Sequence, residues 1–195
     1  MVDKQVRERV LEAADRLYYG RGIQSVGMDE LRLASGVSLK GLYGAFPSKA
    51  AIVLEVLDRR HALWTEGVTE RVAAATTPRD RLLAIYDYLA DWFVDDTFRG
   101  CGFINAFAEL GSISPEVAQR AREHKAGFQA YVSRLVTAAG ADPALAPQLS
   151  ILAEGAQTTA AIAGTGDAAV HARRAAGILI DAAMPARRTP SHPAP

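Results

Sequence analysis

This 195-residue sequence lacks several features on which secreted and membrane-spanning proteins depend. It has a single cysteine, Cys101, so no disulfide can form within the chain. No apolar run reaches 18 residues, and the N-terminus has no apolar segment of the kind found in signal peptides. We therefore expect a cytoplasmic chain without a membrane-spanning helix.

The sequence also lacks net charge, because 22 Lys and Arg balance 22 Asp and Glu. The charges are nevertheless unevenly distributed. Residues 1–60 carry 10 basic against 8 acidic side chains, whereas residues 61–186 carry 10 against 14. A weakly basic N-terminal part joined to an acidic remainder is compatible with a protein that faces DNA on one side, although charge alone is weak support.

Signatures of catalysis and of metal binding are missing as well. The sequence shows no Gly-rich phosphate loop and no paired-carboxylate arrangement. Cys101 and His124 could be imagined as a nucleophile and its base, but no oxyanion-forming motif accompanies them. His61, His124 and His171 are scattered without the spacing of metal ligands. We expect no enzymatic activity, no metal site and no cofactor.

Apolar residues recur with the period of a helix along nearly the whole chain, and nothing alternates at period two. We therefore predict an all-α fold of about nine helices. Residues 1–47 should form a compact head, and residues 48–184 a larger helical domain. The tail 185–195, with four prolines, is expected to be disordered. The three head helices are predicted at about residues 4–19, 28–35 and 38–46.

Helix starts in the larger domain are marked by capping side chains. Thr77, Ser114 and Asp142 each precede a proline that suits the first helical position, and Ser48 can cap a long helix. A shorter apolar helix is predicted at residues 102–110. The last two helices, at about 143–163 and 167–183, are rich in Ala and apolar nearly all round. Such faces need burial, so we expect them to form a homodimer interface.

The most informative segment is residues 34–49, ASGVSLKGLYGAFPSK. Gly36 suits the left-handed end of one helix, and Ser38 can cap the next. Val37, between them, can plug a small core. Two helices joined by such a tight turn are typical of a helix-turn-helix, whose second helix reads the major groove of DNA.

Residues 22–49 resemble the N-terminal head of the TetR family of bacterial regulators (TetR/AcrR-like). The chain length and the order of the later helices are also similar. This resemblance implies a DNA-binding head and a C-terminal domain that binds a small molecule and dimerises. The matching positions are Gly22, Leu31, Ala34, Gly36, Val37, Ser38, Leu42, Tyr43, Phe46, Ser48 and Lys49.

Specific residues of the motif are candidates for DNA contact. Tyr43 offers a hydroxyl to a phosphate, and Lys49 adds a positive charge beside free amides at a helix start. Base readout falls to Leu39 and Lys40, the large side chains at the start of the reading helix. Two glycines in this helix permit close approach of the backbone to DNA. The predicted DNA-binding set is Ser38, Leu39, Lys40, Gly41, Tyr43, Gly44 and Lys49.

Aromatic residues gather in the middle of the chain, where they could line an apolar pocket for a small molecule. Ordinary core packing is the alternative for each of them. Cys101 lies just before a helix N-terminus, which favours its thiolate, but a redox sensor would lack a resolving cysteine. The predicted ligand-binding set is Trp64, Tyr86, Trp92, Phe103, Phe107, His124, Phe128 and Gln157.

Together these features predict a homodimeric, ligand-responsive transcriptional regulator that binds double-stranded operator DNA. Repression is the usual mode of the family that it resembles. We expect release from the operator by a small apolar or amphipathic effector. The alternative is a helical dimeric adaptor that has lost specific DNA binding, because Gly44 and Ala45 stand where the family usually has larger residues.

Overall fold

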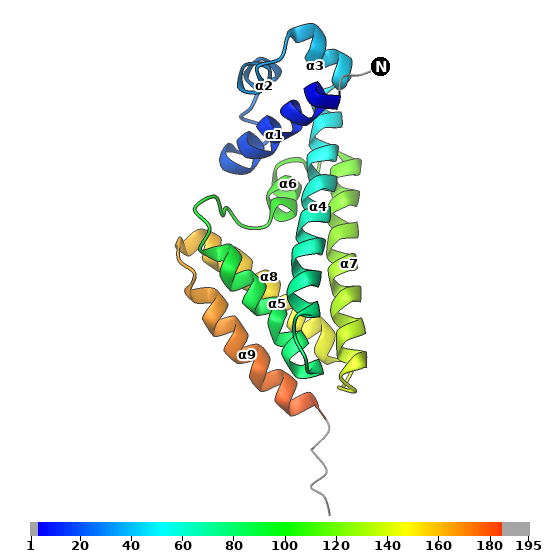
Figure 1. The fold of residues 1–195 in the computed structure, drawn as a ribbon, viewed down its shortest axis with the longest axis vertical. Helices are drawn as coiled ribbons and strands as arrows, with labels where there is room; N and C mark the ends of the chain where they lie inside the picture. The colour runs from blue at the N-terminus through cyan, green and yellow to red at the C-terminus, as the bar shows by residue number, and fades with distance from the viewer. Residues whose placement is uncertain (1–3, 185–195) are drawn as a thin grey trace, which may run out of the picture.

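The computed structural model describes residues 4–184, and within that range the chain forms nine α-helices and no strand (Figure 1). This confirms the predicted all-α fold. No helix in the described range is long and apolar enough to cross a membrane. The tail 185–195, expected to be disordered, lies outside the described residues. The helices are α1 (Lys4–Arg21), α2 (Met28–Ser35), α3 (Leu39–Ala45), α4 (Lys49–Ala73), α5 (Pro78–Phe93), α6 (Gly102–Leu110), α7 (Pro115–Ala138), α8 (Leu145–Ala163) and α9 (Asp167–Ala183).

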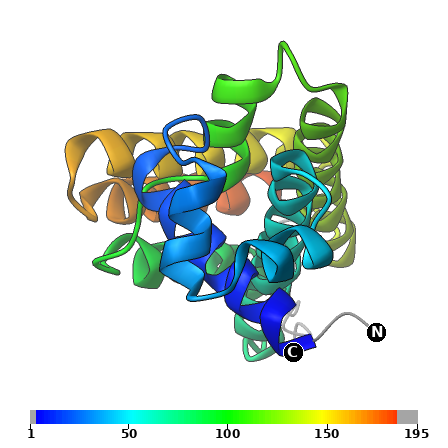
Figure 2. The ribbon, with the colours of Figure 1, turned by 90° about the horizontal axis from the view of Figure 1, so that it is seen from above.

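Helices α1 to α3 form a small head at one end of the molecule, and Figure 2 shows them lying in front of the longer helices. Gly36 ends α2 in the left-handed region at φ 62°. A Cβ there would also lie 2.6 Å from a guanidinium nitrogen of Arg9. Ser38 caps α3 by accepting a hydrogen bond from the Gly41 N–H at 3.0 Å. With Val37 buried beneath the turn, the predicted helix-turn-helix is present.

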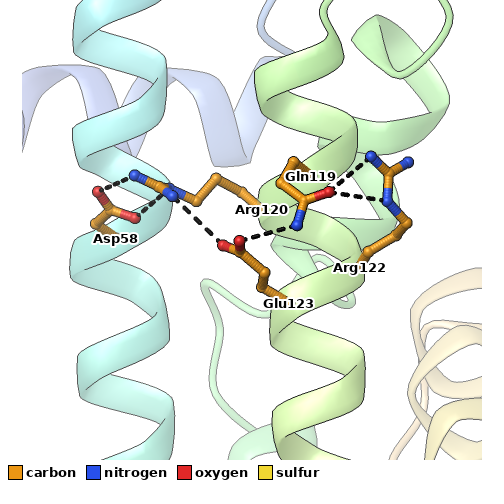
Figure 3. Close-up of polar contacts among 5 residues, drawn as sticks. All are labelled: Asp58, Gln119, Arg120, Arg122 and Glu123. Atoms are coloured by element: carbon orange, nitrogen blue, oxygen red, sulfur yellow. Dashed lines mark hydrogen bonds and ion pairs between the residues drawn. The ribbon is translucent and has the colours of Figure 1, made fainter.

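The long helix α4 connects the head to the larger body. It packs against α5 and α7, while α5 is also contacted by α8 and α9. On the outer side of the α4–α7 contact, Arg120 of α7 pairs with Asp58 of α4 at 2.7 Å and also contacts Glu123 (Figure 3). Helix α5 is therefore the central helix of the body, and α4 is shared between body and head.

Buried side chains form two clusters, which do not divide at residue 47. One cluster gathers α5, α8, α9 and much of α7 around the fully buried Tyr86. The other contains the head residues together with the first half of α4, and it continues into α6 through Phe103 and Ala106. Helix α6 is therefore packed as part of the head's core. The domain boundary at residue 47 stays a prediction.

The capping signals place two of the three proline-marked helix starts correctly. Thr77 and Ser114 each accept a hydrogen bond from the N–H three residues later, with proline at the start of the helix. The predicted start after Asp142 was wrong, since α8 begins at Leu145. The Asp142 carboxylate accepts from the Ala144 N–H at 2.8 Å and so stabilises a turn before the helix instead of capping it.

Candidate DNA-binding face and effector pocket

Helix α3 has one buried face and one exposed face. Leu42 is fully buried and anchors the helix to the head. Leu39 and Tyr43, one turn apart, are each about half exposed, at 49% and 50%. Lys40 is exposed beside them. The side chains predicted to read DNA therefore stand on the outer face of α3, in the geometry that a reading helix requires.

The two glycines of α3 differ in their surroundings. A Cβ at Gly41 would approach the Ser38 hydroxyl to 3.2 Å, so the cap itself favours a small residue there. A Cβ at Gly44 would meet nothing within 4 Å. Contacts within the described chain therefore do not require glycine at position 44. Close approach of DNA to this exposed backbone stays a prediction.

Lys49 lies apart from the other predicted DNA contacts. Its ammonium is 5.9 Å from the centre of the Tyr18 ring, on the side of the head that faces the body. Burial lowers the pKa of Lys49, and the nearby Glu109 partly opposes this shift. A phosphate contact would require the side chain to turn outward. Leu33 of α2, 68% exposed, is a large apolar residue of the head surface that sequence reasoning missed.

A cavity of about 200 Å³ lies between α1, α4, α5, α6 and α7. It brings together four residues of the predicted ligand-binding set: Trp64, Trp92, Phe103 and His124. A fifth, Phe128, is packed edge-on against Trp64 with ring centres 5.0 Å apart, outside the lining. The cavity therefore draws on segments that are far apart in the sequence.

His124 is held in this aromatic wall in its neutral form. Its ring stacks on Phe103 with centres 3.9 Å apart, and its Nδ1 lies 2.9 Å from the Nδ1 of His61. Burial, the charge of Lys125 and the neighbouring His61 lower the pKa of His124 to about 3. Two histidines that appeared scattered in the sequence are thus paired by the packing of α4 on α7. Among the described residues, no three potential metal ligands converge.

Besides Phe128, three more residues of the predicted ligand-binding set do not line the cavity. Tyr86 is fully buried in the body core, where its hydroxyl donates to the Leu149 carbonyl at 2.8 Å. Gln157 is also buried, and its amide bonds to the carbonyl of Ala153 on its own helix. Phe107 is 49% exposed on the outer side of α6. The helical pattern identified these residues as apolar or unusual but could not show which face each would occupy.

The cavity also includes charged residues that sequence reasoning missed. Arg60 of α4 forms a two-pronged ion pair with Asp15 of α1, with Nη2 and Oδ2 3.1 Å apart. The guanidinium carbon lies 3.7 Å from the centre of the Tyr19 ring. A signal was available, because Arg60 continues the buried stripe of Val53 and Leu57 at helical spacing. A charge on such a stripe marks a partner or a cavity.

Cys101 also lines the cavity, but it is only 5% exposed and is enclosed by neighbouring side chains. The Lys125 ammonium lies 3.4 Å from its sulfur, and the same ammonium pairs with Glu154 of α8. The thiol makes no capping hydrogen bond at the start of α6. These contacts place the thiol in a polar corner of the cavity, and its redox role stays open.

The loop before α6 is tied to the head through Tyr19. The tyrosine hydroxyl donates to the Gly100 carbonyl at 2.7 Å and accepts from the Arg99 N–H at 2.9 Å. Since α1 carries both Tyr19 and Asp15, a single turn of α1 contacts both the loop and the cavity. The position of α1 therefore depends on the loop that precedes α6.

The other end of α6 is tied to the head by a carboxylate. Glu109 accepts hydrogen bonds from the backbone N–H groups of Ile23 at 2.9 Å and Gln24 at 2.8 Å, both in the turn between α1 and α2. The Gln24 side chain in turn donates to the Glu109 carbonyl at 2.7 Å. Helix α6 thus places Phe103 against the cavity and Glu109 against the DNA-binding head.

The sequence is similar to two family models and to known transcriptional regulators. Residues 10–56 match the family model described as bacterial regulatory proteins, tetR family, and residues 78–177 match the tetracyclin repressor-like C-terminal domain. The transcriptional repressor NemR of Escherichia coli is 27% identical over 134 residues, which cover 68% of this chain and 67% of NemR. The transcriptional activator FasR of Mycolicibacterium smegmatis is 34% identical over 91 residues, 47% of this chain and 42% of FasR.

Solved structures show the same fold over nearly the full length. A TetR-family regulator from Streptomyces coelicolor superposes with a TM-score of 0.87 at 24% identity, covering 93% of this chain and 97% of its own. A TetR-type regulator from Streptomyces avermitilis gives a TM-score of 0.80 at 29% identity, covering 92% and 99%. The arrangement of a three-helix head on a helical body is therefore shared with these proteins.

Proposed function

The chain belongs to the TetR family of bacterial transcriptional regulators, and we propose that it is a repressor released from its operator by a small molecule bound in the cavity beside Trp64. The observation that carries this proposal is the placement of α6. Phe103 on this helix lines the cavity, and Glu109 on the same helix holds the turn between α1 and α2. A ligand that shifts α6 therefore acts on the head.

DNA contact in this proposal is made by the outer face of α3 and the start of α4. Leu39 and Lys40 meet base edges, Tyr43 meets phosphate, and Gly44 allows close approach. Phosphate contact at the start of α4 comes first from its free N–H groups, with Lys49 contributing when its side chain turns outward. The protein would act in the cytoplasm, where bacterial DNA lies, and would carry no enzymatic activity, as is usual for transcriptional regulators.

A second copy of the chain would pack against α8 and α9. These helices leave large apolar side chains exposed, including Ile162 at 84% and Val170 at 67%. Pairing them across a two-fold axis would bury these side chains and place two heads on successive major grooves, about 34 to 36 Å apart. A ligand releases DNA only to the extent that it binds the spacing unsuited to DNA more tightly.

DNA binding is tested with the DNA that flanks the protein's own gene. Lys40→Ala should weaken protection unevenly across operator positions, by about 1 to 3 kcal/mol where the lysine meets a base. Arg134→Ala, an exposed cation on α7 far from the head, is the matched control. Absence of protection by the unaltered protein at low salt would favour the dimeric adaptor instead.

A further inference from the structure

Donor-only side chains hold three positions of the cavity lining, beside Tyr88 and His124, which can both donate and accept hydrogen bonds. The indole groups of Trp64 and Trp92 can only donate, and the Arg60 guanidinium is likewise a donor without acceptor capacity. The single carboxylate in the lining belongs to Asp15, and Arg60 already holds it by two hydrogen bonds. A ligand that satisfies Trp64, Trp92 and Arg60 must bring acceptor atoms of its own.

Among the described residues, Arg60 is the only cationic side chain in the lining, and it is only about one-fifth exposed. Its stem passes close to α6, because a Cβ at Gly102 would lie 3.2 Å from the Arg60 Cδ. Its planar group is fixed against the ring of Tyr19. The guanidinium is therefore a pre-oriented fork of the kind that binds carboxylates and similar planar anions with two hydrogen bonds.

We infer that the effector is an amphipathic organic anion whose apolar body fills the space between Trp64, Trp92 and Phe103 and whose carboxylate, or an equivalent anionic group, takes Arg60 from Asp15. This inference rests on the proposed function and adds the chemical class of the ligand. It also identifies Arg60 as the residue that makes the cavity prefer anionic ligands.

Other ligand charges fit the cavity less well. A cation bound at Asp15 would be repelled by the Arg60 guanidinium, which is held against the Tyr19 ring. An anion bound at Arg60 meets the corresponding repulsion from Asp15, and Asp15→Asn removes it. A neutral apolar ligand would leave the Arg60–Asp15 pair intact and the indole donors unused. An anion satisfies the donors and at the same time breaks a tie between α4 and α1.

The described residues contain three ion pairs between α1 and α4: Arg7–Glu55, Arg59–Glu8 and Arg60–Asp15. Only the last lines the cavity. Exchange of Asp15 for a ligand anion would therefore loosen the head at one point while the other two pairs persist. The released Asp15 lies one turn from Tyr19, the residue that holds the loop before α6.

The test uses three probes with one apolar body and different charge: 4-phenylbutyrate, 4-phenylbutan-1-ol and 4-phenylbutylammonium. The chain contains two tryptophans and both line the cavity, so intrinsic fluorescence reports binding there directly. The unaltered protein should bind the anion most tightly. Arg60→Gln should weaken the anion roughly tenfold or more while changing the alcohol less than about twofold.

Asp15→Asn is a variant that should change the affinity for the anion in the opposite direction. Removal of the competing carboxylate should tighten binding of 4-phenylbutyrate, an effect that a damaged fold cannot produce. Arg59→Gln is the matched control, because it removes a neighbouring α1–α4 pair outside the cavity and should leave all three affinities unchanged. Thermal unfolding of each variant separates loss of fold from loss of binding.

Each outcome bears on the inference. Preference of the unaltered protein for the alcohol or the ammonium, equal losses of anion and alcohol in Arg60→Gln, or binding of none of the three probes would overturn it. DNA protection by the protein is measured separately, so a regulator that binds DNA but prefers another ligand class remains distinguishable. Release of DNA by 4-phenylbutyrate would support both proposals. The release should be weaker in Asp15→Asn although this variant binds the anion more tightly, because the ion pair that the anion breaks is already absent.

Discussion

The head and the cavity differ in how the chain assembles them. The exposed face of α3 comes from a few consecutive residues, from the Ser38 cap to the exposed Tyr43. The cavity takes side chains from five helices, so that Asp15 meets Arg60 and His61 meets His124 across 45 and 63 residues of sequence. Local turn chemistry builds the first region, whereas helix packing builds the second.

This difference explains why the two regions can serve different roles. A motif made of neighbouring residues keeps its geometry wherever the head is placed. A cavity made of side chains from several helices changes shape whenever those helices move, which a ligand-controlled site requires. Helix α6 belongs to both, because it is buried in the head's cluster and also lines the cavity through Phe103.

The strongest challenge to this contrast is a cavity-forming substitution in α3. Leu42→Ala should lower the free energy of unfolding by about 2 to 5 kcal/mol, since Leu42 is fully buried in the head. Because the same cluster includes Phe103 and Ala106, amide exchange should also accelerate in α6. Leu39→Ala, on the exposed face of the same helix, should alter stability by no more than about 0.5 kcal/mol. Unchanged exchange in α6 would show that the head is an independent unit after all.

Acid should affect the cavity through His124. Its pKa in the folded chain is about 3, against an ordinary value of 6.5, so the unfolded chain binds the additional proton. The contribution of neutral His124 to the free energy of unfolding is therefore complete above pH 6.5, and it is lost as the pH falls from 6.5 towards 3. At about pH 5 the loss relative to neutral pH is about 2 kcal/mol.

The measurement is denaturant unfolding of the unaltered protein and His124→Phe across this pH range. The variant should lack this part of the pH dependence, although His61 on α4 and Lys125 on α7 still face the position. His171→Gln, an exposed histidine of α9, should retain it. Parallel curves for the unaltered protein and His124→Phe would contradict a neutral buried imidazole.

The sequence was sufficient to predict what depends on neighbouring residues. The Gly36 turn and the caps at Ser38, Thr77 and Ser114 followed from local chemistry. The same logic failed at Asp142, where an equally plausible carboxylate forms a turn instead of a cap. Capping signals identify a helix start within a few residues, and a proline can lie on either side of it.

The cavity was predicted less completely, because residue type does not determine which neighbours a helix face will meet. Tyr86 and Trp92 lie on the same helix, yet Tyr86 is in the core and Trp92 lines the cavity. Arg60 continues the buried stripe of α4, but Asp15 looks like an ordinary surface charge in the sequence. Only the crossing of α1 over α4 shows that they pair, and no local pattern encodes that crossing.

A weaker effect is expected at the contact between α6 and the head. Glu109→Gln should cost about 1 kcal/mol, because an amide has one acceptor oxygen for the two N–H groups of Ile23 and Gln24. Hydrogen exchange at these two amides should accelerate, and a cavity ligand should have less influence on DNA binding. Glu66→Gln, an exposed residue of α4, is the control. Unaltered coupling in Glu109→Gln would place the connection between cavity and head elsewhere.

The smallest effect is expected at the outer contact between α4 and α7. Asp58 lies two residues before Arg60, but it pairs with Arg120 of α7, and the side chains of Asp58 and Arg120 are 53% and 40% exposed. Asp58→Asn should therefore change stability by less than about 1 kcal/mol and leave the affinity for 4-phenylbutyrate unaltered. Titrations of Asp58→Asn and Arg60→Gln under the same conditions compare two ionic contacts of one helix. If the two substitutions change ligand affinity equally, affinity depends on the position of α4 as a whole. Exchange of Asp15 for the ligand anion is then not needed to explain how the ligand loosens the head.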